Sequence, residues 1–122
     1  MSYNWGPHYI VPSETLKSYS GSVRLREKFD EDLLRKELEE LDLSGPIVRV
    51  TNPWYYRKRN TDTWIKIGES NDRHENFPVR WDTTNLENDQ YEVLGLMHAF
   101  VKKGSEEKAI ARENIIEVAV EN

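Results

Sequence analysis

The sequence predicts a mainly β protein with one amphipathic helix and an irregular N-terminal segment. Beyond residue 46, apolar and polar side chains alternate in short runs separated by polar stretches, which is typical of strands with one buried face. A leucine stripe with helical spacing occurs between residues 30 and 43. The two patterns together predict a sheet structure on which a single helix packs.

The N-terminal segment is expected to be irregular because Gly6, Pro7 and Pro12 interrupt any regular pattern. It is richer in aromatic residues than a typical disordered tail, so we expect part of it to dock along a sheet edge or over an opening in the core. A frayed terminus is the alternative. We therefore predict an N-terminal segment, residues 1–20, and one domain, residues 21–122.

A short strand and then the helix are expected next in the chain. Apolar and basic residues alternate over residues 23–26, which predicts the strand. In the helix, at about residues 30–43, Asp30 can accept a hydrogen bond at the N-cap and Gly45 marks the end. The face expected to pack on a sheet consists of Leu34, Leu38 and Leu41.

The remaining elements are predicted strands joined by polar loops. Pro53 cannot donate a ladder hydrogen bond, so we expect a bulge or an edge position there. Residues 102–107 are expected to form a loop. The strands are predicted at residues 47–50, 54–56, 63–68, 77–81, 91–101 and within 109–120. Their shared parity predicts a set of core residues, namely Trp81, Tyr91, Val93, Val118 and Val120.

Composition limits the functional classes. A chain of 122 residues can bury a core without covalent crosslinks. It has no cysteine, which excludes disulfides and thiolate metal sites. The net charge of −5 argues against a nucleic-acid partner bound through overall charge. No apolar run approaches the roughly 20 residues that span a bilayer. The N-terminus also lacks the basic and apolar regions of a signal peptide.

Catalytic and metal-binding patterns are missing from the sequence. The three histidines, His8, His74 and His98, lie far apart, and there is no GxSxG or phosphate-binding glycine motif. Acidic loop residues could supply oxygen ligands to calcium, but the EF-hand spacing is absent and we favour turn-stabilising roles for them. These residues are Asp72, Asp82, Glu87 and Asp89. We therefore expect no enzymatic activity, no cofactor and no bound metal.

A resemblance to a known family rests on motifs in the second half of the chain. WDTTNL at residues 81–86, followed by a strand that Tyr91 opens, resembles the late strands of bacterial and archaeal immunoglobulin-like (fibronectin-III-like) accessory domains. WIKIG at residues 64–68 is similar to one arm of their central hairpin, and IIEVAVEN resembles their last strand. The resemblance covers residues 47–122 and implies an immunoglobulin-like β-sandwich in which Tyr91 hydrogen-bonds across a corner. A two-layer α+β arrangement is the alternative for the first half.

The best candidate for a binding site lies at residues 54–59, where aromatic and basic residues are adjacent. If Trp54 and Tyr56 face the core, Tyr55 faces outward. We expect a non-catalytic binding or spacer module that makes protein–protein or assembly contacts, and carbohydrate binding through exposed aromatics is the alternative. The residues expected to bind are Tyr55, Arg57, Lys58 and Arg59. The sequence predicts a soluble chain but no compartment. A secreted or cell-surface location would require that the chain is a domain of a longer protein.

Overall fold

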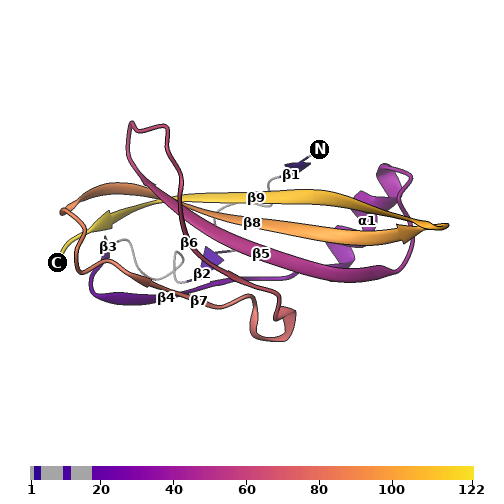
Figure 1. The fold of residues 1–122 in the computed structure, drawn as a ribbon, viewed down its shortest axis with the longest axis horizontal. Coiled ribbons are helices and arrows are strands. Elements are labelled where there is room, and N and C mark those ends of the chain that lie inside the picture. The colour runs from indigo at the N-terminus through magenta and orange to yellow at the C-terminus, as the bar shows by residue number, and fades with distance from the viewer. Residues whose placement is uncertain (1, 4–9, 12–17) are drawn as a thin grey trace.

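Figure 1 shows a computed structural model of the chain, which describes residues 2–3, 10–11 and 18–122. The mainly β class with one helix is confirmed. The helix is α1 (Glu31–Glu40), and a single 3₁₀ turn covers Arg73–Glu75. The strands are β1 (Ser2–Tyr3), β2 (Ile10–Val11), β3 (Ser18–Tyr19), β4 (Ser22–Glu27), β5 (Ile47–Lys58), β6 (Ile65–Ser70), β7 (Val79–Asp82), β8 (Asp89–Lys103) and β9 (Glu106–Val120).

The strands form one long sheet and one small sheet. The long sheet has the order β1-β9-β8-β5-β6, with β3 also paired to β9, and the small sheet has the order β2-β4-β7. β1 and β3 run parallel to β9, whereas all other pairs are antiparallel. The described parts of the N-terminal segment therefore lie on sheet edges, as expected. The remainder of that segment lies outside the described residues, and its separation from a domain at residues 21–122 stays a prediction.

The core consists of two clusters along the long sheet. α1 lies near the end of the sheet that carries the β8–β9 turn, and β4 and β7 lie toward the opposite end (Figure 1). The aromatic cluster joins both sheets and contains Tyr19, Val23, Leu25, Trp54, Trp81, Tyr91, Val93, Ile116, Val118 and Val120. The helix cluster contains Leu34, Leu38, Val50, Phe77, Met97, Ala99, Val101 and Ile110. All five core residues that strand parity predicted are buried.

α1 begins as predicted and ends earlier than predicted. The Asp30 carboxylate accepts from the Leu33 N–H at 3.0 Å, which satisfies one of the free N–H groups of the first turn. At the other end, the Asp42 N–H donates to the Glu39 carbonyl and the Leu43 N–H donates to the Leu38 carbonyl. Asp42 takes the left-handed conformation (φ 57°) that usually favours glycine. The helix thus ends at Glu40 through a Schellman-type turn, before Gly45 is reached.

One strand and one turn differ from the expected ones. β5 continues through Pro53 and is an inner strand between β8 and β6, so the predicted interruption and the edge alternative are wrong. A register shift in the pairing of β5 with β6 does occur, between Trp54 and Tyr55. The predicted loop at residues 102–107 is wrong as well. Only Gly104 and Ser105 form the turn between β8 and β9, because oppositely charged residues pair across the ladder on both sides of it.

The WDTTNL motif builds the turn that connects β7 and β8. The Asp82 carboxylate accepts from both the Thr84 N–H and the Thr84 hydroxyl, and Thr83 donates to the Gly21 carbonyl from its N–H and its hydroxyl. The Tyr91 hydroxyl then donates to the Glu87 carbonyl at 2.8 Å. These bonds confirm the predicted turn-stabilising role of Asp82.

Asn122 fastens the end of β9 to the same region. Its side chain accepts from the Gly21 N–H and donates to the Thr83 carbonyl. Its backbone exchanges two hydrogen bonds with the side chain of Asn88. One asparagine therefore joins the C-terminal end of β9 to two connections that are distant in sequence, the β3–β4 turn and the β7–β8 connection.

Candidate binding surface

The outer face of the long sheet carries an apolar row of three residues. Tyr55 on β5 pairs with Leu94 on β8, and Leu94 pairs with Ile115 on β9. Because neighbouring residues on each strand belong to the aromatic cluster, these three side chains point away from the core. Leu94 is only 7% exposed although it belongs to neither core cluster, and Tyr55 and Ile115 are half-buried. The outer face thus has a packed apolar centre where an antiparallel sheet usually presents polar residues.

A charged row borders the apolar row on one side. Arg57, Glu92 and Glu117 occupy matching positions on β5, β8 and β9. The Arg57 guanidinium bonds the Glu92 carboxylate at 3.0 Å, and its Cζ lies 4.2 Å from the centroid of the Trp64 ring. The Arg57 side chain is therefore held between a carboxylate and an indole at the border of the apolar row.

The four residues predicted to bind do not form one surface. Tyr55 and Arg57 lie on the outer face, as the alternation required. Lys58 instead bonds Glu87 at 2.6 Å and Asp89 at 3.3 Å, and Arg59 is an exposed loop residue. Glu87 and then Asp89 raise the pKa of Lys58 above its ordinary value. The basic tip is thus largely charge-matched by neighbouring acids and presents little surplus positive charge.

A hollow of about 500 Å³ lies beside Lys58, between the β5–β6 loop and the β7–β8 connection. The rings of Tyr56 and Tyr91 contribute to its wall, with their centroids 6.3 Å apart. Ile65, which is 49% exposed, stands at its rim. The remaining lining residues are Thr61, Thr63, Asn85, Leu86 and Glu87. This hollow has the mixed apolar and polar lining of a binding cleft, but its rings Tyr56 and Tyr91 belong to the inner face of the sheet, opposite to the apolar row.

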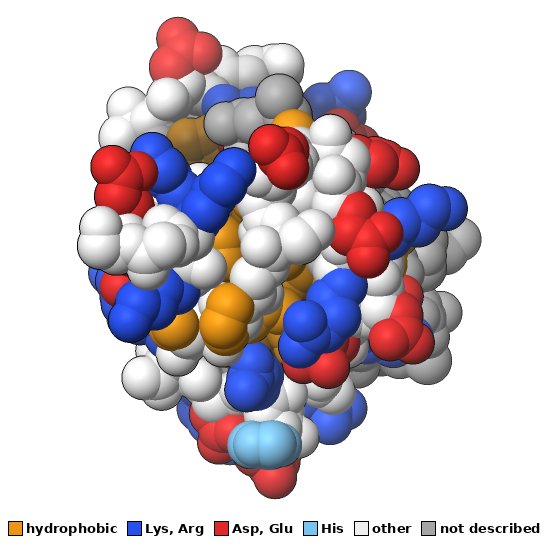
Figure 2. All heavy atoms as spheres, turned by 90° about the vertical axis from the view of Figure 1, so that its right-hand side faces the viewer, with side chains coloured by type: hydrophobic (Ala, Val, Ile, Leu, Met, Phe, Trp, Pro, Cys, Tyr) orange, Lys and Arg blue, Asp and Glu red, His pale blue; other side chains and the backbone are white. Residues whose placement is uncertain are grey.

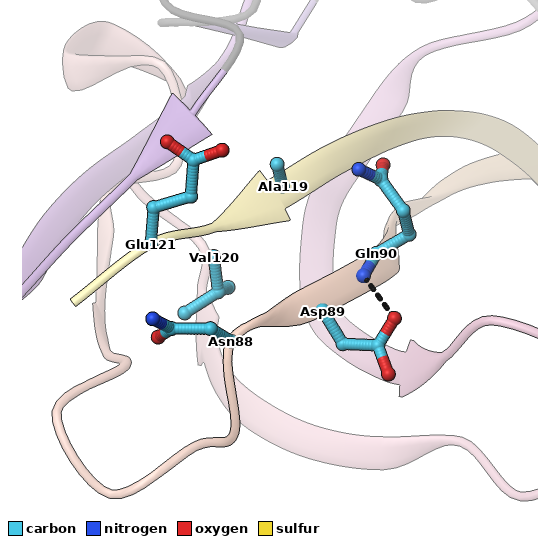
Figure 3. Close-up of a pocket in the computed structure, with 6 residues that line it drawn as sticks. All are labelled: Asn88, Asp89, Gln90, Ala119, Val120 and Glu121. Carbon is cyan, nitrogen blue, oxygen red and sulfur yellow. Dashed lines mark hydrogen bonds between the residues drawn. The ribbon is translucent and has the colours of Figure 1, made fainter.

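A second, smaller hollow of about 210 Å³ lies near the C-terminal end of β9 (Figure 3). Its lining comes from the start of β8 and the end of β9, including Gln90 and Glu121. The Asp89 carboxylate accepts from the Gln90 N–H at 2.7 Å, and this bond and then Lys58 lower the pKa of Asp89. The hollow is thus a shallow polar notch in which one carboxylate is held by a backbone N–H group.

Buried polar groups separate the two core clusters. Glu27 on β4 is fully buried, and the Asn114 amide donates to its carboxylate. The Glu27 carboxyl also packs on Gly95, where an added Cβ would lie 2.9 Å from Oε2. Burial raises the pKa of Glu27 from 4.5 to about 8, although the amides of Asn114 and Asn52 oppose the shift. On the helix side, the buried Arg112 pairs with Glu37 of α1 at 2.6 Å.

Charges of both signs cover the end of the molecule that carries α1 and the β8–β9 turn, around a few hydrophobic side chains (Figure 2). His74 is an exposed residue of the 3₁₀ turn and His98 is half-buried on the outer face of β8, whereas His8 lies outside the described residues. Within the described ranges, no three His, Asp or Glu side chains are grouped to hold a metal ion. In the same ranges, no helix is both long and apolar enough to cross a membrane.

Comparisons with known proteins gave no match: no family model, no curated protein and no solved structure is similar enough to this chain to be reported. Function is therefore inferred from the chain's own surfaces.

Sequence reasoning missed the apolar centre of the outer face. Leu94 and Leu96 share the parity of His98, which is opposite to the parity of the buried Tyr91 and Val93. That pattern signals a strand with apolar residues on both faces. Comparing the two parities of residues 91–101 would have found the surface.

Proposed function

We propose that this chain is a non-catalytic, immunoglobulin-like module that binds a protein partner through the outer face of its long sheet. The observation that carries the proposal is the apolar row Tyr55–Leu94–Ile115, which lies outside both core clusters and is bordered by charged side chains. An apolar patch with a polar rim on a soluble domain is typical of a surface that contacts another protein.

The strand arrangement supports the immunoglobulin-like part of the proposal. A three-stranded sheet shares an aromatic core with a larger sheet, and the N-terminal segment pairs antiparallel with β4 and parallel with β9. Trp54 is fully buried on a central strand. The Tyr91 hydroxyl bonds a carbonyl four residues upstream, as in the tyrosine corner of such domains. α1 is an insertion between β4 and β5, and it covers the half of the long sheet that carries the β8–β9 turn.

Carbohydrate binding is the second candidate, and the aromatic side chains support it less well. A sugar ring stacks on an open aromatic face, whereas guanidinium groups lie over Trp64 and Phe100. Among the described residues, the large hydrophobic side chains that are exposed are the aliphatic Val48 and Ile65. Aliphatic and half-buried surfaces suit contact with a protein better than sugar stacking.

The proposal can be tested with a phage library of random dodecamer peptides selected on the immobilised chain. We expect selected peptides to shift the backbone amide NMR signals of Tyr55, Leu94 and Ile115. Tyr55→Ala and Ile115→Thr should each weaken those peptides because they remove apolar contact area without reaching the core.

Val48→Thr is the matched control, because Val48 is an exposed aliphatic residue (45%) that lies far along β5 from the row. The proposed site would be overturned by selected peptides that shift the NMR signals of residues on other surfaces. It would also be overturned by peptides that bind Tyr55→Ala and Ile115→Thr as tightly as the wild type. A panel of soluble glucans and xylans that shifted the Trp64 and Tyr55 signals instead would favour the carbohydrate alternative.

A further inference from the structure

Two carboxylates on β9 lie on either side of the apolar row and have no partner among the residues that the structure describes. Glu113 and Glu117 lie two residues before and two residues after Ile115, so all three side chains point to the outer face. Both glutamates are exposed, and neither forms an ion pair or a side-chain hydrogen bond with any residue that the structure describes. Most other charges near the row are neutralised by a neighbour.

The local charge balance of the outer face is therefore negative. The Arg57 guanidinium is matched by Glu92, and the Lys66 ammonium is matched by Glu69 at 3.0 Å. Glu113 and Glu117 remain as surplus negative charge, on a chain whose net charge is −5. At a rise of about 3.3 Å per residue, the two carboxylates are separated by roughly 13 Å along the strand.

From this arrangement we propose that the partner presents a basic surface, with an apolar side chain flanked by two lysine or arginine residues that reach Glu113 and Glu117. This inference rests on the proposed function and specifies its partner chemistry. The apolar row supplies contact area, and the two carboxylates select partners by charge and fix the register of docking. A second copy of this acidic chain is disfavoured as the partner, because the two surplus carboxylates would face like charges.

The test repeats the dodecamer selection in parallel on the wild type and on the double variant Glu113→Lys/Glu117→Lys. Wild-type selections should be enriched in peptides with Lys or Arg on both sides of an apolar residue, and the variant should reverse the enrichment to Asp and Glu. A basic peptide selected on the wild type should bind the variant roughly two- to thirtyfold more weakly, and the difference should shrink in high salt.

The matched control is Glu39→Lys/Glu40→Lys, which reverses two exposed charges on α1 and should leave the enrichment unchanged. Peptides that shift the NMR signals of the apolar row but are not enriched in Lys or Arg would overturn this inference and leave the proposed function standing. An equal change with the α1 variant would also overturn it, because net charge alone would then explain the bias. Absence of any peptide that maps to the row would contradict both proposals.

Discussion

The two halves of the long sheet bury their inner faces in different ways. Near the β3–β4 turn, Trp81 of β7 packs edge to face on Tyr19 of β3 and on Tyr91 of β8, at 6.1 Å and 6.3 Å between ring centroids, and a ring of β5 packs against it at a tilt. Near the β8–β9 turn, the aliphatic side chains Leu34 and Leu38 of α1 cover the sheet. The aromatic half joins segments that are far apart in the sequence, whereas the helical half is closed by one local element. Buried polar groups divide them, so the two halves are expected to respond differently to substitution.

The largest effect is expected in the aromatic half. Trp81→Ala should lower the free energy of unfolding by roughly 3–5 kcal/mol, because it removes a ring that is 2% exposed and that contacts three other rings. Chemical denaturation of the two proteins measures the difference. Equal denaturation midpoints would remove Trp81 from the core and would also weaken the immunoglobulin-like assignment.

In the helical half, Leu38→Ala should lower the free energy of unfolding by about 2–5 kcal/mol, because it truncates a side chain that is 1% exposed in the helix cluster. The change is local, so hydrogen exchange should accelerate in the amides of α1 more than in those of β4 and β7. Leu33→Ala is the milder control, since Leu33 is only partly buried on the same helix. Uniform acceleration across all elements would show that the two halves unfold as one unit.

The boundary between the halves should make stability depend on pH. The folded pKa of Glu27 is about 8, against 4.5 as the ordinary value, so the folded chain holds a proton that the unfolded chain releases. This contribution to stability is complete below about pH 4.5 and is lost as the pH rises toward 8, with a slope of at most about 1.4 kcal/mol per pH unit. Wild-type stability should therefore fall across this window.

Glu27→Gln should flatten that fall, because a neutral amide can replace the protonated carboxyl and still accept from Asn114. At pH 8 the variant should be more stable than the wild type by roughly 1–3 kcal/mol, and the difference should vanish near pH 4. Urea unfolding at several pH values measures both curves. Parallel curves from pH 5 to 8 would mean that Glu27 is ionised in the folded state and would contradict the prediction.

Strand alternation reveals part of the buried interior of the long sheet and misses another part. Alternation predicted the buried Trp81 and Val118, because periodicity reports which residues share a face. The same parity places Arg112 and Asn114 in the interior with Val118, yet charged and amide side chains are normally assigned to the surface. Their burial depends on partners from β4 and α1, and pairing between distant segments cannot be read from one strand.

For the candidate surface, too, the sequence does not show how distant strands pair. The outward direction of Tyr55 followed from alternation, but its contact with Leu94 and Ile115 depends on the register of three strands. Lys58 and Arg57 are adjacent in the sequence and were grouped together, although alternation sends them to opposite faces of β5. Sequence alone therefore indicated which residue types could bind, and the strand register determined which of them share a surface.

The smallest effect tests whether the helical half depends on its local cap. Asp30→Ala should cost about 1 kcal/mol, because it removes the acceptor of the Leu33 N–H at the start of α1. Asp32→Ala is a close control, since Asp32 is an exposed acid of the same first turn whose side chain does not cap the helix. If loss of charge near the helix N-terminus were the cause, the two variants would lose similar stability. A clearly larger loss of stability in Asp30→Ala, measured by denaturation and by hydrogen exchange of the Leu33 amide, would assign the effect to the cap. It would show that α1 is stabilised partly by a local hydrogen bond and not only by its packing on the sheet.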